Sequence, residues 1–117
     1  MKEEKLKEYL LLFPGSSVST PFTPNTNVYK VKDKIFALYQ VKEGYININI
    51  KAEPEDNLGY RDIFECVSPG YHMNKKHWST IKVTGEMPEN FFKQVLKESY
   101  EIIIKSLTKK QREEIKS

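Results

Sequence analysis

The residue types most able to bind a ligand or catalyse a reaction lie in one short segment, residues 69–78, whose sequence is PGYHMNKKHW. It contains both histidines of the chain, its single tryptophan and two adjacent lysines. As an exposed loop it could bind an anion or a nucleic acid, because Lys75 and Lys76 would neutralise phosphates while Tyr71 and Trp78 stack on bases. The alternative is a packed turn in which Trp78 joins the core and the lysines are merely solvated. The sequence allows both interpretations.

The two histidines do not form a recognisable metal or catalytic motif. His72 and His77 lack the HExxH spacing, and neither a cysteine nor an acidic residue lies between them. A general base also needs an orienting partner, and the sequence shows none. We therefore expect no metal site and no catalytic residue. An enzyme or small-ligand site built from His72, Asn74 and His77 is a lesser alternative.

The single cysteine, Cys66, cannot form an internal disulfide or a CxxC motif, which favours a reducing compartment. We expect it near the C-terminus of a helix, where the dipole raises a thiol pKa, so it fits a small core residue better than a nucleophile. The patterns of P-loops, dinucleotide sites, nucleophile elbows and EF-hands do not occur. Together these features predict a protein that is not an enzyme and holds no cofactor.

A second candidate surface comes from the alternating segment 45–51. Three isoleucines share one phase and would pack on the core, while the other phase is polar and meets water or a ligand. The polar phase consists of Tyr45, Asn47, Asn49 and Lys51. Together with Lys30 it could form an open sheet face that hydrogen-bonds a partner. An ordinary solvated face is an equal alternative.

The charges are segregated along the chain, although the formal net charge is only +3. Residues 28–42, 66–85 and 102–117 are each net basic, whereas residues 53–65 and 86–101 are net acidic. Our hypothesis is that the fold gathers the distant lysines into one electropositive platform beside the Tyr71–Trp78 loop.

Periodicity and breaker residues predict the elements that would position these side chains. Hairpin-length connections between strands favour an antiparallel sheet, so the fold class is α+β, with two layers. Residues 14–26 and 67–70 are expected to be loops. The helix that begins at Pro88 is expected to carry one continuous apolar stripe, made of Phe92, Val95, Leu96, Ser99, Ile103 and Leu107. The expected helices are 2–12, Pro54 to near Cys66, Pro88 to about Leu107, and 109–116 capped by Thr108; the expected strands are 27–31, 35–40, 45–51 and 77–84.

The length of 117 residues fits one domain spanning residues 1–117 with a core that needs no disulfide or metal. No apolar stretch is long enough for a membrane span, and the N-terminal apolar run is too short for a usual signal peptide. We therefore expect a cytoplasmic monomer with no membrane partner.

Several segments resemble the MmcQ/YjbR family along nearly the whole chain. The most distinctive is Pro69-Gly70-Tyr71-His72-Met73-Asn74-Lys75-Lys76-His77-Trp78-Ser79-Thr80-Ile81; the others are Pro21-Phe22, Val28-Tyr29-Lys30-Val31, Lys34-Ile35-Phe36-Ala37-Leu38, Pro88, Ser99-Tyr100 and Leu107–Lys110. The resemblance implies a curved antiparallel sheet packed against helices, described as CyaY-like or double-wing. Two departures are a short segment at residues 40–45 and acidic residues within 53–60.

Members of the family are commonly labelled DNA-binding, so the leading hypothesis is a DNA-binding or regulatory accessory protein. The alternative is a chaperone-like protein-interaction module that uses the open sheet face. The expected nucleic-acid-binding residues are Lys30, Tyr71, His72, Asn74, Lys75, Lys76 and His77.

Overall fold

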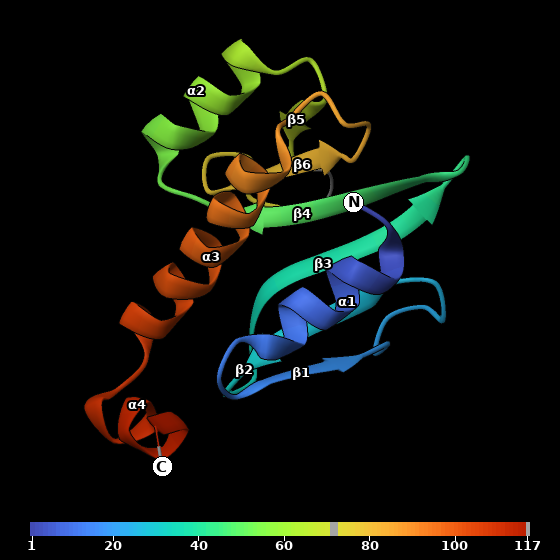
Figure 1. The fold of residues 1–117 in the computed structure, drawn as a ribbon. Helices are drawn as coiled ribbons and strands as arrows, with labels where there is room; N and C mark the ends of the chain where they lie inside the picture. The colour runs from blue at the N-terminus through green and yellow to red at the C-terminus, as the bar shows by residue number, and fades with distance from the viewer. Residues whose placement is uncertain (71–72, 117) are drawn as a thin grey trace.

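The computed structural model describes residues 1–70 and 73–116. Within them, six strands form one antiparallel sheet in the order β1-β2-β3-β4-β6-β5, accompanied by four helices (Figure 1). The architecture is α+β, as predicted. In chain order the elements are α1 (Glu3–Leu12), β1 (Ser16–Ser19), β2 (Asn27–Val31), β3 (Lys34–Lys42), β4 (Tyr45–Lys51), α2 (Pro54–Ile63), β5 (Val67–Pro69), β6 (Trp78–Lys82), α3 (Glu89–Ser106) and α4 (Lys109–Lys116).

Two tight turns determine the antiparallel order of the central strands. Lys32 and Asp33 both have positive φ between β2 and β3, and Glu43 and Gly44 do so between β3 and β4. Positive φ at both central residues matches the right-handed twist of the flanking strands in a two-residue hairpin. The register of β3 against β4 then follows, with Leu38 opposite Asn49.

In the part of the chain that the structure describes, the helices cover one face of the sheet and leave the other without a helix. α1 and α3 lie across one face, and α2 lies beside β5 and β6 (Figure 1). The three isoleucines of β4 are buried on the helix side, which confirms the predicted alternation. The predicted apolar stripe of α3 is also buried; it comprises Phe92, Val95, Leu96, Ser99, Ile103 and Leu107. Burial of these side chains is the main stabilising contribution to the fold.

An irregularity between β2 and β3 gives the sheet a local bend. Tyr29 pairs with Ala37 and Lys30 pairs with Ile35, so Phe36 is the extra residue of a bulge. Phe36 is fully buried. Its carbonyl oxygen accepts a 2.6 Å hydrogen bond from Ser99 Oγ, which ties α3 to the bulge.

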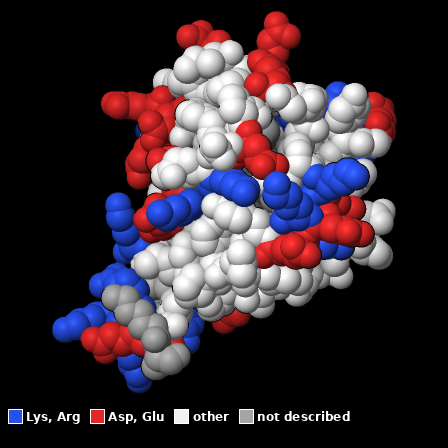
Figure 2. Space-filling view, viewed as in Figure 1, with Lys and Arg blue, Asp and Glu red and all other residues white. Residues whose placement is uncertain are grey.

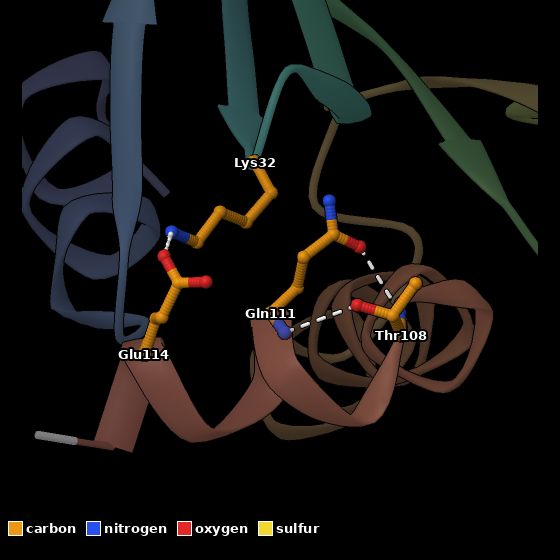
Figure 3. Close-up of polar contacts among 4 residues, drawn as sticks. All are labelled: Lys32, Thr108, Gln111 and Glu114. Carbon is orange, nitrogen blue, oxygen red and sulfur yellow. Dashed lines mark hydrogen bonds and ion pairs between the residues drawn. The ribbon is translucent and has the colours of Figure 1, made fainter.

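The last helix begins at a capping box (Figure 3). Thr108 Oγ1 accepts the Gln111 backbone N–H, and Gln111 Oε1 accepts the Thr108 N–H, which satisfies two donors that the helix leaves free. The predicted cap at Thr108 is confirmed. None of the helices in the described residues is long and apolar enough to cross a bilayer.

Two strands were not expected from the sequence. β1 lies within the predicted loop 14–26, and β5 lies within the predicted loop 67–70. Both are edge strands of three or four residues, and β1 is mostly serine while β5 ends at Pro69. Such short edges take their structure from the neighbouring strand rather than from a periodic pattern of their own.

Candidate nucleic-acid interface

The sheet face without helices is defined by strand register. Lys51 lies opposite Trp78, Asn47 opposite Lys82, and Lys42 opposite Tyr45, so these side chains share one face. We call this surface the open face. Its residues are Lys30, Ile35, Leu38, Gln40, Lys42, Tyr45, Asn47, Asn49, Lys51, Trp78, Thr80 and Lys82.

The open face is strongly basic for its size. The open-face residues include four lysines and no aspartate or glutamate. Lys82 Nζ lies 4.5 Å from the centroid of the Tyr45 ring, a cation–π contact that holds both side chains over the sheet. Asn49 Oδ1 accepts a hydrogen bond from Thr80 Oγ1 across the neighbouring strands. Positive charge, aromatic rings and amides therefore lie side by side.

A groove is hollowed into the open face beside β3. Its space is about 540 Å³, and its walls come from the loop after β1, from β3 and from Met73. The lining residues are Phe22, Thr23, Thr26, Ile35, Leu38, Gln40, Lys42 and Met73. Four of these side chains are apolar, so the groove can accept a flat apolar group next to a basic surface.

One wall of the groove is a short chain of hydrogen bonds. Thr23 Oγ1 and Thr26 Oγ1 are 2.9 Å apart, and Gln40 Nε2 donates to Thr26 Oγ1 at 2.8 Å. Thr26 is buried, so these bonds hold the loop down on β3. Phe22, four residues earlier, is 65% exposed at the mouth of the groove.

The loop before β6 is fixed by α2 through its backbone. Arg61 Nη2 donates to the carbonyl oxygens of Lys75 and Trp78, and Asn57 Nδ2 donates to that of Lys76. The Lys75 and Lys76 side chains are exposed. Hydrogen bonds from α2 therefore hold the backbone of this loop while the two lysine side chains face solvent, an arrangement that both interpretations of the sequence allow.

The other predicted residues of this loop have different surroundings. Asn74 Oδ1 accepts the Lys76 backbone N–H, so its side chain shapes the turn. His77 is half-buried, and its carbonyl oxygen accepts the Ala52 N–H. Tyr71 and His72 lie outside the described residues.

Gly70 shows how closely the loop approaches β6. A Cβ at this position would come within 2.8 Å of the Trp78 Cβ, and the Gly70 N–H donates to the Trp78 carbonyl oxygen at 2.9 Å. Only glycine fits this contact without a shift of the backbone.

The fold divides the predicted lysine cluster at residues 28–42. Lys30 and Lys42 lie on the open face, but two others bind at the far end of the sheet. Lys32 Nζ forms a 2.9 Å ion pair with Glu114 of α4 (Figure 3), and Lys34 Nζ contacts Ser106 O and Oγ at the end of α3. Lys32 and Lys34 therefore do not belong to the single platform that the hypothesis requires.

The helix side of the molecule mixes charges of both signs. In Figure 2 carboxylates gather over α2, basic side chains alternate with acids across the middle, and both occur around α4. The acidic residues Glu53 and Asp56 line a hollow with Glu98 and Glu101 of α3. These two carboxylates therefore face the helix layer rather than the open face.

Sequence reasoning missed the contributions of Lys42, Lys82, Phe22 and Leu38 to this surface. The alternation of Leu38, Gln40 and Lys42 was a usable signal for a face, because the three share one phase of β3. No local pattern marks Phe22, which reaches the groove only through the path of its loop.

The described residues contain no group of three or more side chains suited to hold a metal ion. Cys66 lies beyond the end of α2, and burial, with Glu86 next to it, raises the pKa of its thiol. The direction agrees with the prediction, but the main cause is burial rather than the helix dipole. This environment suits a packed thiol.

Comparison with known proteins gives consistent results. A family model described as YjbR matches residues 11–102. "Uncharacterized protein YbdF" of Escherichia coli O157:H7 is 31% identical, covering 97% of this chain and 93% of that protein. "Uncharacterized protein YjbR" of Escherichia coli K12 is 28% identical, covering 96% and 95%.

Solved structures show the same fold. The crystal structure of Deinococcus radiodurans protein DR2400, a DUF419 domain, superimposes with a TM-score of 0.90 at 30% identity, covering 96% of this chain and 86% of that one. A Pseudomonas syringae protein gives a TM-score of 0.76 at 22% identity, covering 87% and 98%. The sequence match over most of the chain, the relatives and the shared fold together establish that this protein belongs to the YjbR family.

Proposed function

We propose that this protein binds DNA through the open face of its sheet. The observation that carries the proposal is a helix-free face with four lysines, no carboxylate and adjacent aromatic rings. Lysines that neutralise phosphates supply most of the affinity in sequence-independent binding. Tyr45 and Trp78 add surfaces on which bases can stack. The binding should depend strongly on salt and only weakly on sequence.

In this proposal Lys75 and Lys76 add two exposed lysines in the loop that precedes β6. Their backbone is held by Arg61 and Asn57, so binding DNA would cost little additional ordering of the loop. Lys30 joins them as an open-face residue that the sequence had already suggested. Asn74 and His77 act in this proposal as supports of the loop.

The single tryptophan gives a direct assay. Trp78 is half-buried on the open face, so a bound oligonucleotide should quench or shift its fluorescence. We expect saturable binding of single-stranded and duplex DNA at low salt. No change in fluorescence or anisotropy with any DNA at tens of micromolar protein would refute the proposal.

Two charge-matched variants locate the surface. Lys42→Glu with Lys82→Glu changes two exposed open-face lysines, and Lys2→Glu with Lys97→Glu makes the same charge change on the helix side. The first pair should weaken binding about tenfold or more, and the second pair by much less. Equal losses would place the binding surface elsewhere. A Lys75→Glu, Lys76→Glu pair tests the loop separately.

A protein-interaction role on the same face is the second candidate. The apolar lining of the groove favours it, because a protein partner could insert a side chain there. Polyglutamate distinguishes the two functions, since it supplies negative charge and a polypeptide backbone but no bases. Polyglutamate binding as tight as that of DNA of equal charge would favour the protein partner.

A further inference from the structure

We infer that the groove beside β3 receives an unpaired nucleobase, so that the protein binds single-stranded DNA more tightly than duplex. This inference rests on the proposed DNA-binding function and concerns the form of DNA that the open face selects. Three features of the groove support it: its size, its lining and the lysines beside it.

The groove is large enough for a base and is open to the surface. Its space of about 540 Å³ lies within the range of roughly 300–1,000 Å³ usual for small-molecule sites. A base in a duplex is stacked and paired, and it must leave the helix to enter such a site. Entry is therefore easier for a base that is already unpaired.

The lining suits the two faces and the edge of a base. Phe22, Leu38 and Met73 present apolar surface to a flat ring. At the polar wall, Gln40 donates one amide hydrogen to Thr26. This bond orients the Gln40 side-chain amide. The second N–H and the carbonyl oxygen of the amide can both pair with the edge of a base.

Lysines stand near both ends of the groove, where a sugar–phosphate backbone would pass. Lys42 lines the groove itself, and Lys30 is paired in register with Ile35, another lining residue. Ile35 and Lys42 are seven residues apart on β3, which at about 3.3 Å per residue corresponds to roughly 23 Å. A strand of a few nucleotides could contact both lysines with one base in the groove.

The experiment measures how tightly the full chain binds three polyanions of equal length at one salt concentration, with affinities expressed per phosphate because a duplex carries twice the phosphates of a single strand. They are a single-stranded thymidine oligonucleotide, its duplex with adenine, and an abasic oligonucleotide of the same sugar and phosphate. Trp78 fluorescence and the anisotropy of a labelled strand report binding. We expect the thymidine strand to bind at least about tenfold more tightly than the abasic strand, because stacking of one base contributes that much.

A matched pair of variants assigns the effect to the groove. Phe22→Ala removes an aromatic side chain that lines the groove. Leu58→Ala is the control, because Leu58 lies on α2, away from the open face, and its exposed fraction is also 65%. Both changes should leave the thermal unfolding midpoint nearly unchanged, because both side chains are largely solvated. Phe22→Ala should weaken binding of the thymidine strand severalfold without affecting the abasic strand, and Leu58→Ala should change neither.

The possible outcomes separate the two claims. Equal affinity for the thymidine, duplex and abasic strands, with no effect of Phe22→Ala, would overturn the base-binding groove while leaving electrostatic DNA binding in place. Tighter binding of duplex than of single strands would also overturn it. Failure of all three polyanions to bind would overturn both the groove and the proposed function.

Discussion

Arg61 Nη2 donates a 2.8 Å hydrogen bond to the carbonyl oxygen of Trp78, which joins α2 to the first residue of β6. The same nitrogen reaches the carbonyl oxygen of Lys75, and Arg61 Nε contacts Ser79 Oγ at 3.2 Å. One guanidinium thus fixes both ends of the loop that presents Lys75 and Lys76. Its planar arrangement of donors cannot be reproduced by an ammonium group.

Arg61→Ala should therefore lower the free energy of unfolding by about 2 kcal/mol, since hydrogen bonds from charged donors are among the stronger ones. Arg61→Lys should recover less than half of that loss. Urea unfolding followed by far-UV circular dichroism measures both. An unchanged midpoint for Arg61→Ala would show that the contacts contribute nothing to stability.

Asn57 makes a second link between α2 and the loop. Its side chain is fully buried, donates to the carbonyl oxygens of Ala52 and Lys76, and accepts the Ser79 hydroxyl at 2.6 Å. Asn57→Ala leaves these groups without their partner, and we expect a loss of about 2–4 kcal/mol because more than one buried polar group is affected. Asn25→Ala, in an exposed loop, is the control. Equal effects of the two variants in urea unfolding would contradict the role given to Asn57.

The reactivity of Cys66 tests its local environment. Burial, followed by hydrogen bonding to Glu86 and its charge, raises the pKa of the thiol, so little thiolate exists at neutral pH. Alkylation by iodoacetamide at pH 7.5 should be slow. The alkylation rate should rise with pH only above the pH range in which an ordinary thiol ionises. Glu86→Gln should shift the rate profile to lower pH, but only in part because burial remains. The chain has one cysteine, so labelling reports this site alone.

Glu86 also makes stability depend on acid. Its carboxylate accepts the backbone N–H groups of Cys66 and Glu65, and the Cys66 hydrogen bond is the main cause that lowers its pKa. A lowered pKa in the folded state means that the stabilisation is complete above the ordinary glutamate pKa and is lost as pH falls through the lower folded value. Glu86→Gln should flatten the decline in unfolding midpoint between about pH 5 and pH 3. An identical decline in both proteins would exclude this contribution.

The sequence predicts the central part of the fold because its signals there are local. The alternation in residues 45–51, the helical stripe of α3 and the cap at Thr108 each depend on neighbouring residues, and all three occur as expected. β1 and β5 depend instead on pairing with β2 and β6, which a single segment does not encode. The helix from Pro54 ends at Ile63, before the predicted end near Cys66.

The candidate site shows the same division. Strand alternation suggested Lys30 and Lys51, but no pattern indicated that Lys32 would contact Glu114 from the opposite end of the chain. A cluster of lysines in the sequence does not show which of them share a face of the sheet, because neighbouring side chains alternate between faces and a turn can carry some of them to another part of the molecule. The groove also requires a loop, a strand and Met73 to meet, which is a tertiary relationship.

The salt dependence of DNA binding can separate lysines that are neighbours in sequence but not in space. Lys42→Gln with Lys82→Gln removes two open-face charges, whereas Lys32→Gln with Lys34→Gln removes two charges near α4 and the end of α3. For a single strand each phosphate contact contributes about 0.7 to the slope of log K against log salt, so the first pair should reduce the magnitude of the slope by about 1.4 if both lysines contact phosphates. The second pair should leave the slope unchanged, and its exposed ion pair contributes about 1 kcal/mol or less to stability.

Anisotropy titrations between 25 and 200 mM salt, roughly the range over which such slopes are resolved, provide the measurement. A smaller slope for the Lys32 and Lys34 pair, with no change for the open-face pair, would move the interface to the α4 end of the sheet.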